Sequence, residues 1–329
     1  MNQFLIKLTA TQQIGAMFVL VFGALVLASV AAFLLSLRER GDDAAAEAWR
    51  ANLSRVDGVL RTSWVMVFVF WVGWLSGDAT TLVLFALVSF FALREFMTLS
   101  PTRRGDHRSL ILAFFIVLPI QYTLVGTKHF NLFTVFIPVY VFLAIPVVSA
   151  LANDPARFLE RNAKLQWGIM VCIYGMSHVP ALLLLNFPQF QNKSAFLVFF
   201  LVLVVQTCMV VQYLASRKFK SAPAAPAISQ SFGWRSWWTG VLAGSVLGGL
   251  LAGLTPFAPG QALALSFLAC VAGSLGHLVM KALKRDRGIP NWGSSGVSVT
   301  GAGGLLDRVD ALCFAAPIFF HSARWYFGL

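Results

Sequence analysis

Apolar runs of about twenty residues, separated by short polar segments, repeat along almost the whole chain. A helix of that length crosses roughly 30 Å of hydrocarbon, so each run predicts one membrane-spanning helix. The expected spans are residues 12–36, 58–76, 79–93, 109–126, 130–151, 167–187, 195–215, 237–256, 261–282 and 310–328. We therefore expect an all-α, polytopic integral membrane protein with about ten transmembrane helices.

The composition agrees with this interpretation. Of the 329 residues, 58% are apolar and only 12% are charged, which is more apolar surface than a protein folded in water needs. We divide the chain into three parts, which are N-terminal spans with a cytoplasmic linking segment (1–108), middle spans (109–215) and a C-terminal region (216–329).

The polar segments predict the topology. If the spans alternate in direction, one side of the membrane holds residues 37–57, 94–108, 152–166, 216–236 and 283–309. That side, with the flanking residues, collects all 25 Lys and Arg residues except Lys7, Lys128, Lys193 and Arg324. Because Lys and Arg concentrate in cytoplasmic loops, we expect this side in the cytoplasm and both termini outside. The net charge of +12 has the same cause, so no nucleic-acid partner is expected.

The last fifty residues carry the clearest candidate chemistry. Asp307 and Asp310 are three residues apart, so they share one face if the last helix starts there. Carboxylates near a helix N-terminus can ligate Mg²⁺, and the preceding Lys284 and Arg285 can neutralise phosphates. The alternative is a positive-inside cluster followed by two helix-capping aspartates, and spacing alone does not separate the two.

Two stretches of this region resemble the signature of a known family. Residues 276–289 read Gly-His-Leu-Val-Met-Lys-Ala-Leu-Lys-Arg-Asp-Arg-Gly-Ile, and residues 303–310 read Gly-Gly-Leu-Leu-Asp-Arg-Val-Asp. Together with residues 313–321, they are similar to CDP-diacylglycerol synthases (phosphatidate cytidylyltransferases) and closest to a bacterial subgroup, of which this chain would be a divergent member. Shorter pieces at 92–96 and 157–168 recur in the family's order, so the resemblance covers most of the chain.

The resemblance implies an enzyme that transfers CMP from CTP to phosphatidate, giving CDP-diacylglycerol and pyrophosphate. It further implies Mg²⁺ as cofactor, a site open to the cytoplasm, a bacterial inner-membrane location, membrane lipids as partners and a homodimer. Region 216–329 is then the catalytic part. The implied roles are metal binding by Asp307 and Asp310, catalysis by these two and Arg308, and phosphate binding by Lys284, Arg285, Arg235, Ser229, Gly303 and Gly304.

The chain departs from the family pattern at several positions. His277 stands where the family has an acidic residue, Lys281 where it has Ser, and Ala302 where it has His. Among the family's acidic positions, only the Asp307 and Asp310 pair is intact. An alternative function is therefore a catalytically degenerate paralogue that binds phosphatidate or CDP-lipid or scaffolds a partner. A lipid transporter is a further alternative, against which the lack of an inverted repeat counts.

Two other features bear on function. The basic loop Arg103–Arg108 either grips lipid phosphate headgroups or only satisfies the orientation rule, and the simpler account is preferred. His178 lies inside an apolar run, where we expect a neutral histidine bonded to a neighbouring helix.

Overall fold

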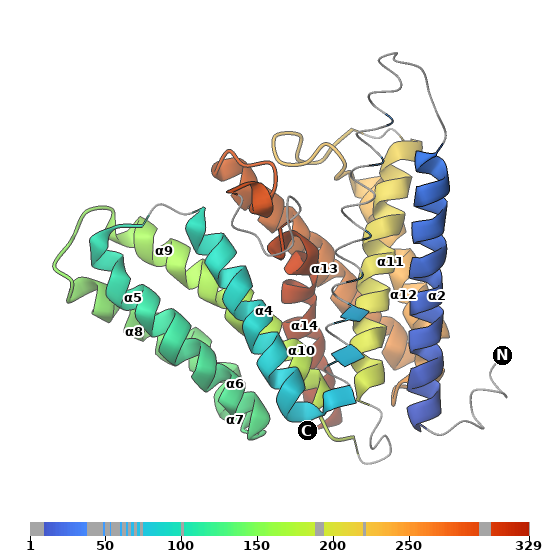
Figure 1. The fold of residues 1–329 in the computed structure, drawn as a ribbon, viewed down its shortest axis with the longest axis horizontal. Coiled ribbons are helices and arrows are strands. Elements are labelled where there is room, and N and C mark those ends of the chain that lie inside the picture. The colour runs from blue at the N-terminus through green and yellow to red at the C-terminus, as the bar shows by residue number, and fades with distance from the viewer. Residues whose placement is uncertain are drawn as a thin grey trace. The chain divides into compact units, whose positions relative to one another are not determined.

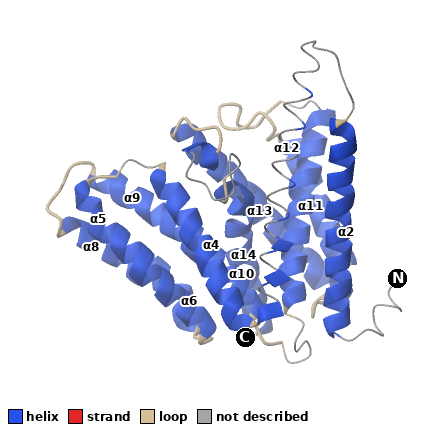
Figure 2. Cartoon of the chain, viewed as in Figure 1, coloured by secondary structure: helices blue, strands red, loops and turns tan. Residues whose placement is uncertain are grey.

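The computed structural model describes residues 10–37, 77–99, 102–187, 194–219, 222–295 and 304–328, with isolated positions between 49 and 76. In this part of the chain every regular element is a helix (Figures 1 and 2). One isolated β-bridge, between Ala225 and Ser229, is the exception. The all-α prediction is confirmed.

The chain forms two compact units, Met1–Thr81 and Leu82–Leu329. Helix α2 (Ala10–Ser36) belongs to the first unit, and α4 (Asp78–Thr98) begins there and continues into the second. The remaining elements of the second unit are η1 (Arg104–Asp106), α5 (His107–Leu112), η2 (Ala113–Val117), α6 (Leu118–Gly126), α7 (Phe130–Val135), η3 (Phe136–Val141), α8 (Phe142–Ala150), α9 (Phe158–Gly168), η4 (Ile169–Gly175), α10 (Met176–Leu183), α11 (Ala195–Phe219), α12 (Trp234–Leu250), η5 (Ala252–Leu254), α13 (Pro259–Asp286), η6 (Trp292–Ser295) and α14 (Leu306–Phe327).

Five helical segments of the described chain are long and apolar enough to cross a membrane. They are Asp78–Thr98, Arg104–Gly126, Phe130–Ala150, Ala195–Phe219 and Pro259–Asp286. These segments overlap the third, fourth, fifth, seventh and ninth expected spans, so the protein is an all-α membrane protein. The other five spans stay predictions, and most of the second, 58–76, lies outside the described residues.

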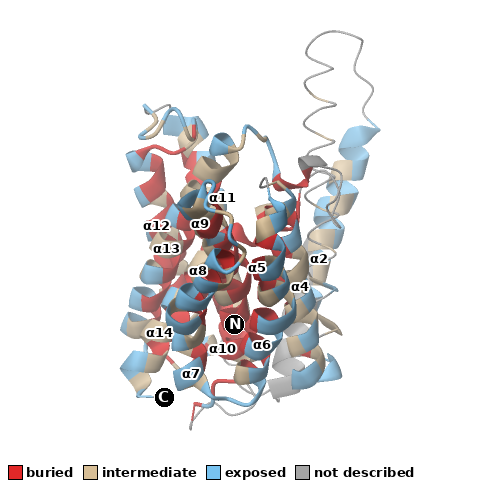
Figure 3. Ribbon diagram, turned by 90° about the vertical axis from the view of Figure 1, so that its left-hand side faces the viewer, coloured by how far each residue is buried: buried red, intermediate tan, exposed pale blue. Residues whose placement is uncertain are grey.

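Outward-facing apolar side chains fit a lipid environment. Phe115, Leu143 and Val246 are each more than half exposed, whereas the opposite faces of the same helices are buried against other helices (Figure 3). Water would disfavour so many exposed apolar groups, and lipid tails do not.

Two elements differ from the expected boundaries. Helix α4 continues five residues beyond the expected end at 93, and α14 begins at Leu306 instead of 310. The charged pair Arg94 and Glu95 suggested an end to the third span. Glu95 is instead buried, because it bonds to the start of α14.

Three π-helical turns, η2, η3 and η4, interrupt the membrane helices near proline residues. Pro119 and Pro180 follow η2 and η4, and Pro138 lies within η3. A proline supplies no N–H to the helix ladder, and a widened turn lets neighbouring groups satisfy the freed carbonyl. The prolines therefore remain inside continuous helices.

Close packing joins the four C-terminal helices that carry the candidate site. Helix α11 packs against α12, α12 against α13, and α13 against α14. A Cβ added at Gly276 of α13 would lie 2.2 Å from the Phe314 ring of α14. The small residue is thus needed for α13 and α14 to approach each other, as in many membrane helix pairs.

Candidate functional site

A polar stripe runs along the last turns of α13. His277, Lys281 and Lys284 follow one another at spacings of four and three residues, so they share one helix face. The helix has 28 residues, which corresponds to about 42 Å and exceeds the roughly 30 Å hydrocarbon layer. The final turns therefore carry the stripe toward the edge of the membrane.

The start of α14 faces this stripe with carboxylates. Lys284 Nζ donates to Asp307 Oδ1 at 2.5 Å, and the side chains of both residues are only 12% exposed. The backbone N–H of Trp292 donates to Asp307 Oδ2 at 2.8 Å. Asp307 thus connects α13, the loop that follows α13, and α14.

The second carboxylate is paired in a similar way. His277 Nδ1 donates to Asp310 Oδ2 at 2.7 Å, and the Asp310 side chain is 4% exposed. The other oxygen of Asp310 accepts from the backbone N–H of Ala311 at 2.6 Å. His277, which replaces an acidic residue of the family pattern, is therefore a direct partner of the pair that the sequence singled out.

A third carboxylate, Glu95 of α4, holds the N-terminus of α14. Its Oε2 accepts from the backbone N–H of Leu306 at 2.8 Å. The residue before the helix, Leu305, offers no side-chain cap, so a distant carboxylate satisfies one of the free N–H groups. A negative charge at this position also complements the helix dipole.

Ser229 contacts the middle residue of the stripe, Lys281. Lys281 Nζ donates to Ser229 Oγ at 3.3 Å. Ser229 is buried on a turn in which its N–H donates to the carbonyl of Ala225 at 2.8 Å. The turn belongs to the loop between α11 and α12, to which these contacts give a defined conformation.

The other predicted phosphate-binding residues have different positions. Arg285 and Arg235 are exposed, and no described residue forms a side-chain bond with either. Gly304 has a φ of +45°, and a Cβ there would lie 2.7 Å from both Glu95 Oε1 and the Gly293 nitrogen. Its lack of a side chain is required by these protein contacts. Gly303 lies outside the described residues.

Two buried donors near the start of α14 have no hydrogen-bond acceptor in the described part of the chain. They are Nε of Arg308 and the indole Nε1 of Trp292. The Trp292 ring packs against Phe96, with centroids 5.3 Å apart. Buried donors without acceptors are unfavourable, so these two groups are suited to an anionic ligand.

The carboxylate oxygens of Asp307 and Asp310 are of the chemical type that can bind a magnesium ion shared with phosphates, and in this structure all four accept hydrogen bonds from the protein. Mg²⁺ is commonly bound through one or two carboxylates, with waters and substrate phosphates completing its shell, and Asp307 and Asp310 supply two carboxylates. The described residues contain no group of three or more His, Cys, Asp or Glu side chains placed to hold a metal. A closed cage of protein ligands is thus absent from this part of the chain.

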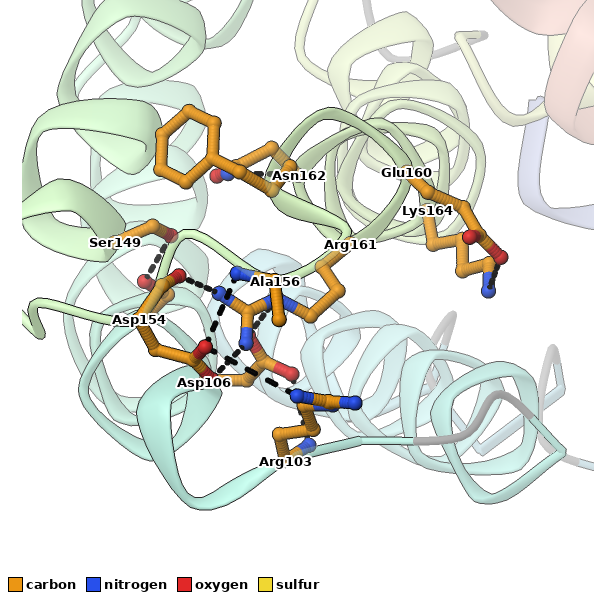
Figure 4. Close-up of polar contacts among 11 residues, drawn as sticks. Arg103, Asp106, Ser149, Asp154, Ala156, Glu160, Arg161, Asn162 and Lys164 are labelled. Atoms are coloured by element: carbon orange, nitrogen blue, oxygen red, sulfur yellow. Dashed lines mark hydrogen bonds and ion pairs between the residues drawn. The ribbon is translucent and has the colours of Figure 1, made fainter.

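A second charged cluster lies between the α4–α5 and α8–α9 loops (Figure 4). The guanidinium of Arg161, 5% exposed, lies 3.3 Å from Asp106 Oδ1 and 2.5 Å from Asp154 Oδ2. It also donates to the Asp154 carbonyl at 2.6 Å. The backbone N–H of Arg103 donates to Asp106 Oδ2 at 2.9 Å. The cluster thus ties the two loops together.

This geometry bears on the basic loop Arg103–Arg108. Two carboxylates, Asp106 and Asp154, face Arg161 and lie close to Arg103, so the cluster's own acids balance its positive charge. The hydrogen bond from Arg161 is the main reason why the pKa of Asp154 lies below its usual value. The cluster fits a structural connection between loops better than a free phosphate grip.

His178 is fully buried, and its bonding partner differs from the expected one. Its Nδ1 donates to the Tyr174 carbonyl at 2.7 Å, one turn earlier on the same helical run. The ring packs against both Phe133 and Phe320. The expected bond to a neighbouring helix is therefore wrong, because the π-helical turn η4 presents a nearby carbonyl on the same run.

Sequence reasoning missed three contributors to the site. The only signal for Glu95 was an acidic residue at the end of an apolar run, within a short stretch that recurs in the family. Trp292 contributes through its backbone, which leaves no trace in the side-chain pattern. Lys281 was noted only as a departure, and its position beside Ser229 depends on how the helices pack.

Comparisons with known proteins relate most of the chain to one family. The pattern that describes the cytidylyltransferase family matches residues 59–326. The uncharacterized protein YnbB of Escherichia coli K12 is 34% identical over 270 residues, covering 81% of this chain and 86% of YnbB.

More distant relatives carry the name phosphatidate cytidylyltransferase. The protein from Rickettsia felis is 26% identical over 149 residues, which is 42% of this chain and 63% of the relative. The protein from Mycobacterium leprae is 28% identical over 174 residues, which is 52% of each chain. The matches to these two relatives thus span less than two thirds of their lengths.

Proposed function

The chain belongs to the cytidylyltransferase family of nucleotidyltransferases, and we propose that it is a phosphatidate cytidylyltransferase. Its substrates would be CTP and phosphatidate, and its products CDP-diacylglycerol and pyrophosphate. The relatives that carry this name support the choice of substrates. The product is an intermediate of phospholipid biosynthesis, which fits a protein embedded in the membrane.

In the proposed reaction a phosphate oxygen of phosphatidate attacks the α-phosphorus of CTP. A new P–O bond forms, the bond between the α-phosphorus and the oxygen bridging to the β-phosphorus breaks, and pyrophosphate leaves with that oxygen and the electron pair. The lipid supplies the nucleophile, so the protein needs only to position the phosphates and to stabilise the developing charge.

One observation carries the proposal: the basic face of α13 lies opposite the carboxylates of α14. Lys284 and Asp307 bond across this contact, as do His277 and Asp310. Lys284 and the unsatisfied Nε of Arg308 supply donors for phosphate oxygens. The exposed Arg285 and Arg235 would attract the anionic substrates toward the site.

A magnesium ion bound by Asp307 and Asp310 would neutralise charge on the phosphates and polarise the α-phosphate. The two side chains would hold the ion together with substrate oxygens, and Lys284 and His277 would keep both carboxylates oriented. The location that we propose is the cytoplasmic side of a bacterial inner membrane, because CTP is a cytoplasmic nucleotide. A homodimer remains part of the proposal through the family resemblance alone.

The test is formation of CDP-diacylglycerol from radiolabelled CTP and phosphatidate by the purified protein in nanodiscs. We expect product that depends on Mg²⁺ or Mn²⁺ and equimolar release of pyrophosphate. Absence of product with either ion, under conditions where a known family enzyme is active, would reject the proposal.

A second candidate function is a non-catalytic paralogue that binds phosphatidate or CDP-lipid. It is favoured by the pairing of Asp307 with Lys284 and of Asp310 with His277, which occupies carboxylate oxygens that a metal would need. The same assay distinguishes the candidates, because a non-catalytic paralogue would bind phosphatidate but release no pyrophosphate.

A further inference from the structure

Lys281 is a cation without a carboxylate partner in the described part of the chain. Its side chain is partly buried, and the one bond that it forms there is to the neutral hydroxyl of Ser229 at 3.3 Å. Asp310, an acid whose charge acts on Lys281, is already bonded to His277. Lys281 differs in this respect from Lys284, whose charge is balanced by Asp307.

The thirteen residues around Ser229, which lie between Lys220 and Arg235, bring no positive charge of their own. Residues 222–234 contain neither Lys nor Arg, so α13 supplies the ammonium group beside this hydroxyl. Ser229 is buried, and its position on the turn is held by the bond from its N–H to the Ala225 carbonyl. Its hydroxyl also lies 3.3 Å from Ser231 Oγ, so hydroxyl donors gather next to the ammonium.

This combination matches a phosphate group. A partly buried ammonium without a counter-ion is unfavourable, and a charged oxygen ligand removes the penalty. Phosphate oxygens accept hydrogen bonds from ammonium and hydroxyl groups together, and such charge-assisted bonds are strong. The ammonium of Lys281 lies on the same helix face as that of Lys284, so both can contact one chain of phosphates.

We propose that Lys281 is a further phosphate-binding residue of the site and that it acts beside the hydroxyl of Ser229. This inference rests on the proposed function and assigns Lys281 to a phosphate of the nucleotide or of the lipid headgroup. The two sources share the same chemistry, and the experiment distinguishes them.

The experiment measures binding to the full-length protein in nanodiscs without turnover. One arm titrates inorganic pyrophosphate and CTP into phosphatidylcholine nanodiscs, and the other measures binding of phosphatidate. Lys281→Met should raise the dissociation constant at least about tenfold in one arm, as expected for loss of a charge-assisted hydrogen bond. Lys281→Arg should stay within about threefold of the wild type, since it keeps the charge.

Lys218→Met is the matched control. Lys218 is an exposed lysine in the last turn of α11, and its replacement removes the same charge away from the site. We expect wild-type binding in both arms. Thermal unfolding of each variant checks that the protein is folded.

If Lys281→Met does not fold, chemical acetylation of Lys281 is measured on the wild type with and without pyrophosphate or phosphatidate. Bound phosphate should protect Lys281 from acetylation, and absence of protection overturns the inference.

The outcomes separate this inference from the proposed function. Weaker binding by Lys281→Met supports the inference even if the wild type forms no CDP-diacylglycerol, in which case only the catalytic proposal fails. Unchanged binding in both arms, with an active wild type, overturns the inference and leaves the catalytic proposal intact. No binding of any probe by the wild type overturns both.

Discussion

Two carboxylates, each bonded to a nitrogen-bearing side chain of the neighbouring helix, define the candidate site at the scale of single residues. Asp307 pairs with Lys284 and Asp310 with His277, at distances of 2.5 and 2.7 Å. Lys284 and Asp307 are largely buried, so removing one of them leaves the charge of the other uncompensated. Each position therefore influences both the stability of the α13–α14 contact and the binding of ligands.

Replacement of the carboxylates tests their assignment. Asp307→Ala and Asp310→Ala should each lower CDP-diacylglycerol formation about a hundredfold or more, because charge stabilisation at the reacting phosphates is lost. Asp286→Asn is the control, since Asp286 is exposed and, among the described residues, forms an ion pair only with the adjacent Arg287. Initial rates on folded protein are the measurement. Near-normal rates in both alanine variants would remove these residues from the catalytic assignment.

The Arg161 cluster gives a pH prediction. The pKa of Asp154 lies below its usual value of 3.8, chiefly through the bond from Arg161. Because its pKa is lowered on folding, ionised Asp154 stabilises the folded state at pH values above 3.8. This contribution is lost as the pH falls through the lowered pKa. The thermal unfolding midpoint of the wild type should therefore fall more steeply than that of Asp154→Asn below about pH 4. Parallel profiles would contradict the prediction.

At the scale of the helices, close contacts determine which side chains can meet. Aspartate is short, so bonds from Asp307 and Asp310 to α13 require closely spaced helix axes. Gly276 provides this spacing between α13 and α14, and Gly175 of η4 provides it on another face of α14. The apolar pattern of the sequence determines where the helices form, and these small residues determine how closely the helix axes approach one another.

A substitution at Gly175 tests this view. A Cβ there would lie 2.3 Å from the backbone oxygen of Cys313, which cannot rotate away. Gly175→Ala should therefore destabilise the protein by roughly 1–3 kcal/mol, as overpacking does. Gly260→Ala is the control, because nothing lies within 4 Å of its added Cβ. Thermal unfolding in nanodiscs gives the comparison, and equal midpoints for both variants would refute the packing argument.

At the scale of the whole molecule, the distribution of charge predicts which side of the membrane holds the site. The His277–Lys284 stripe follows an apolar helix and belongs to the side rich in Lys and Arg. The positive-inside rule then predicts that this end faces the cytoplasm. The nucleotide substrate that we propose would require the same orientation.

Cysteine labelling tests the orientation. The four native cysteines are buried, so their reaction with a membrane-impermeant maleimide should be weak. Lys218→Cys, at the predicted cytoplasmic end of α11, should react only after the membrane is permeabilised. Thr127→Cys, in the loop between α6 and α7, should react in intact spheroplasts. The opposite pattern would reverse the topology.

Several features follow from the sequence by itself. Long apolar runs determine helices, because in lipid each backbone group must be bonded within its own segment. The spacing of Asp307 and Asp310 predicts that both share one helix face if the helix includes them. This condition is met, because α14 begins at Leu306. The end of α4 was misjudged, since the charge of Glu95 reads as a surface residue until its partner on α14 is known.

The tertiary structure alone decided which charges meet. Glu95 and Leu306 are 211 residues apart, and Lys281 and Ser229 are 52 apart, so neither contact has a local pattern. Helical periodicity reports which face a side chain occupies, whereas the partner of that face depends on how close the helices lie and how they are rotated. For this reason the sequence determined the helices and the carboxylate pair, and the packing of α4, α13 and α14 determined what that pair contacts.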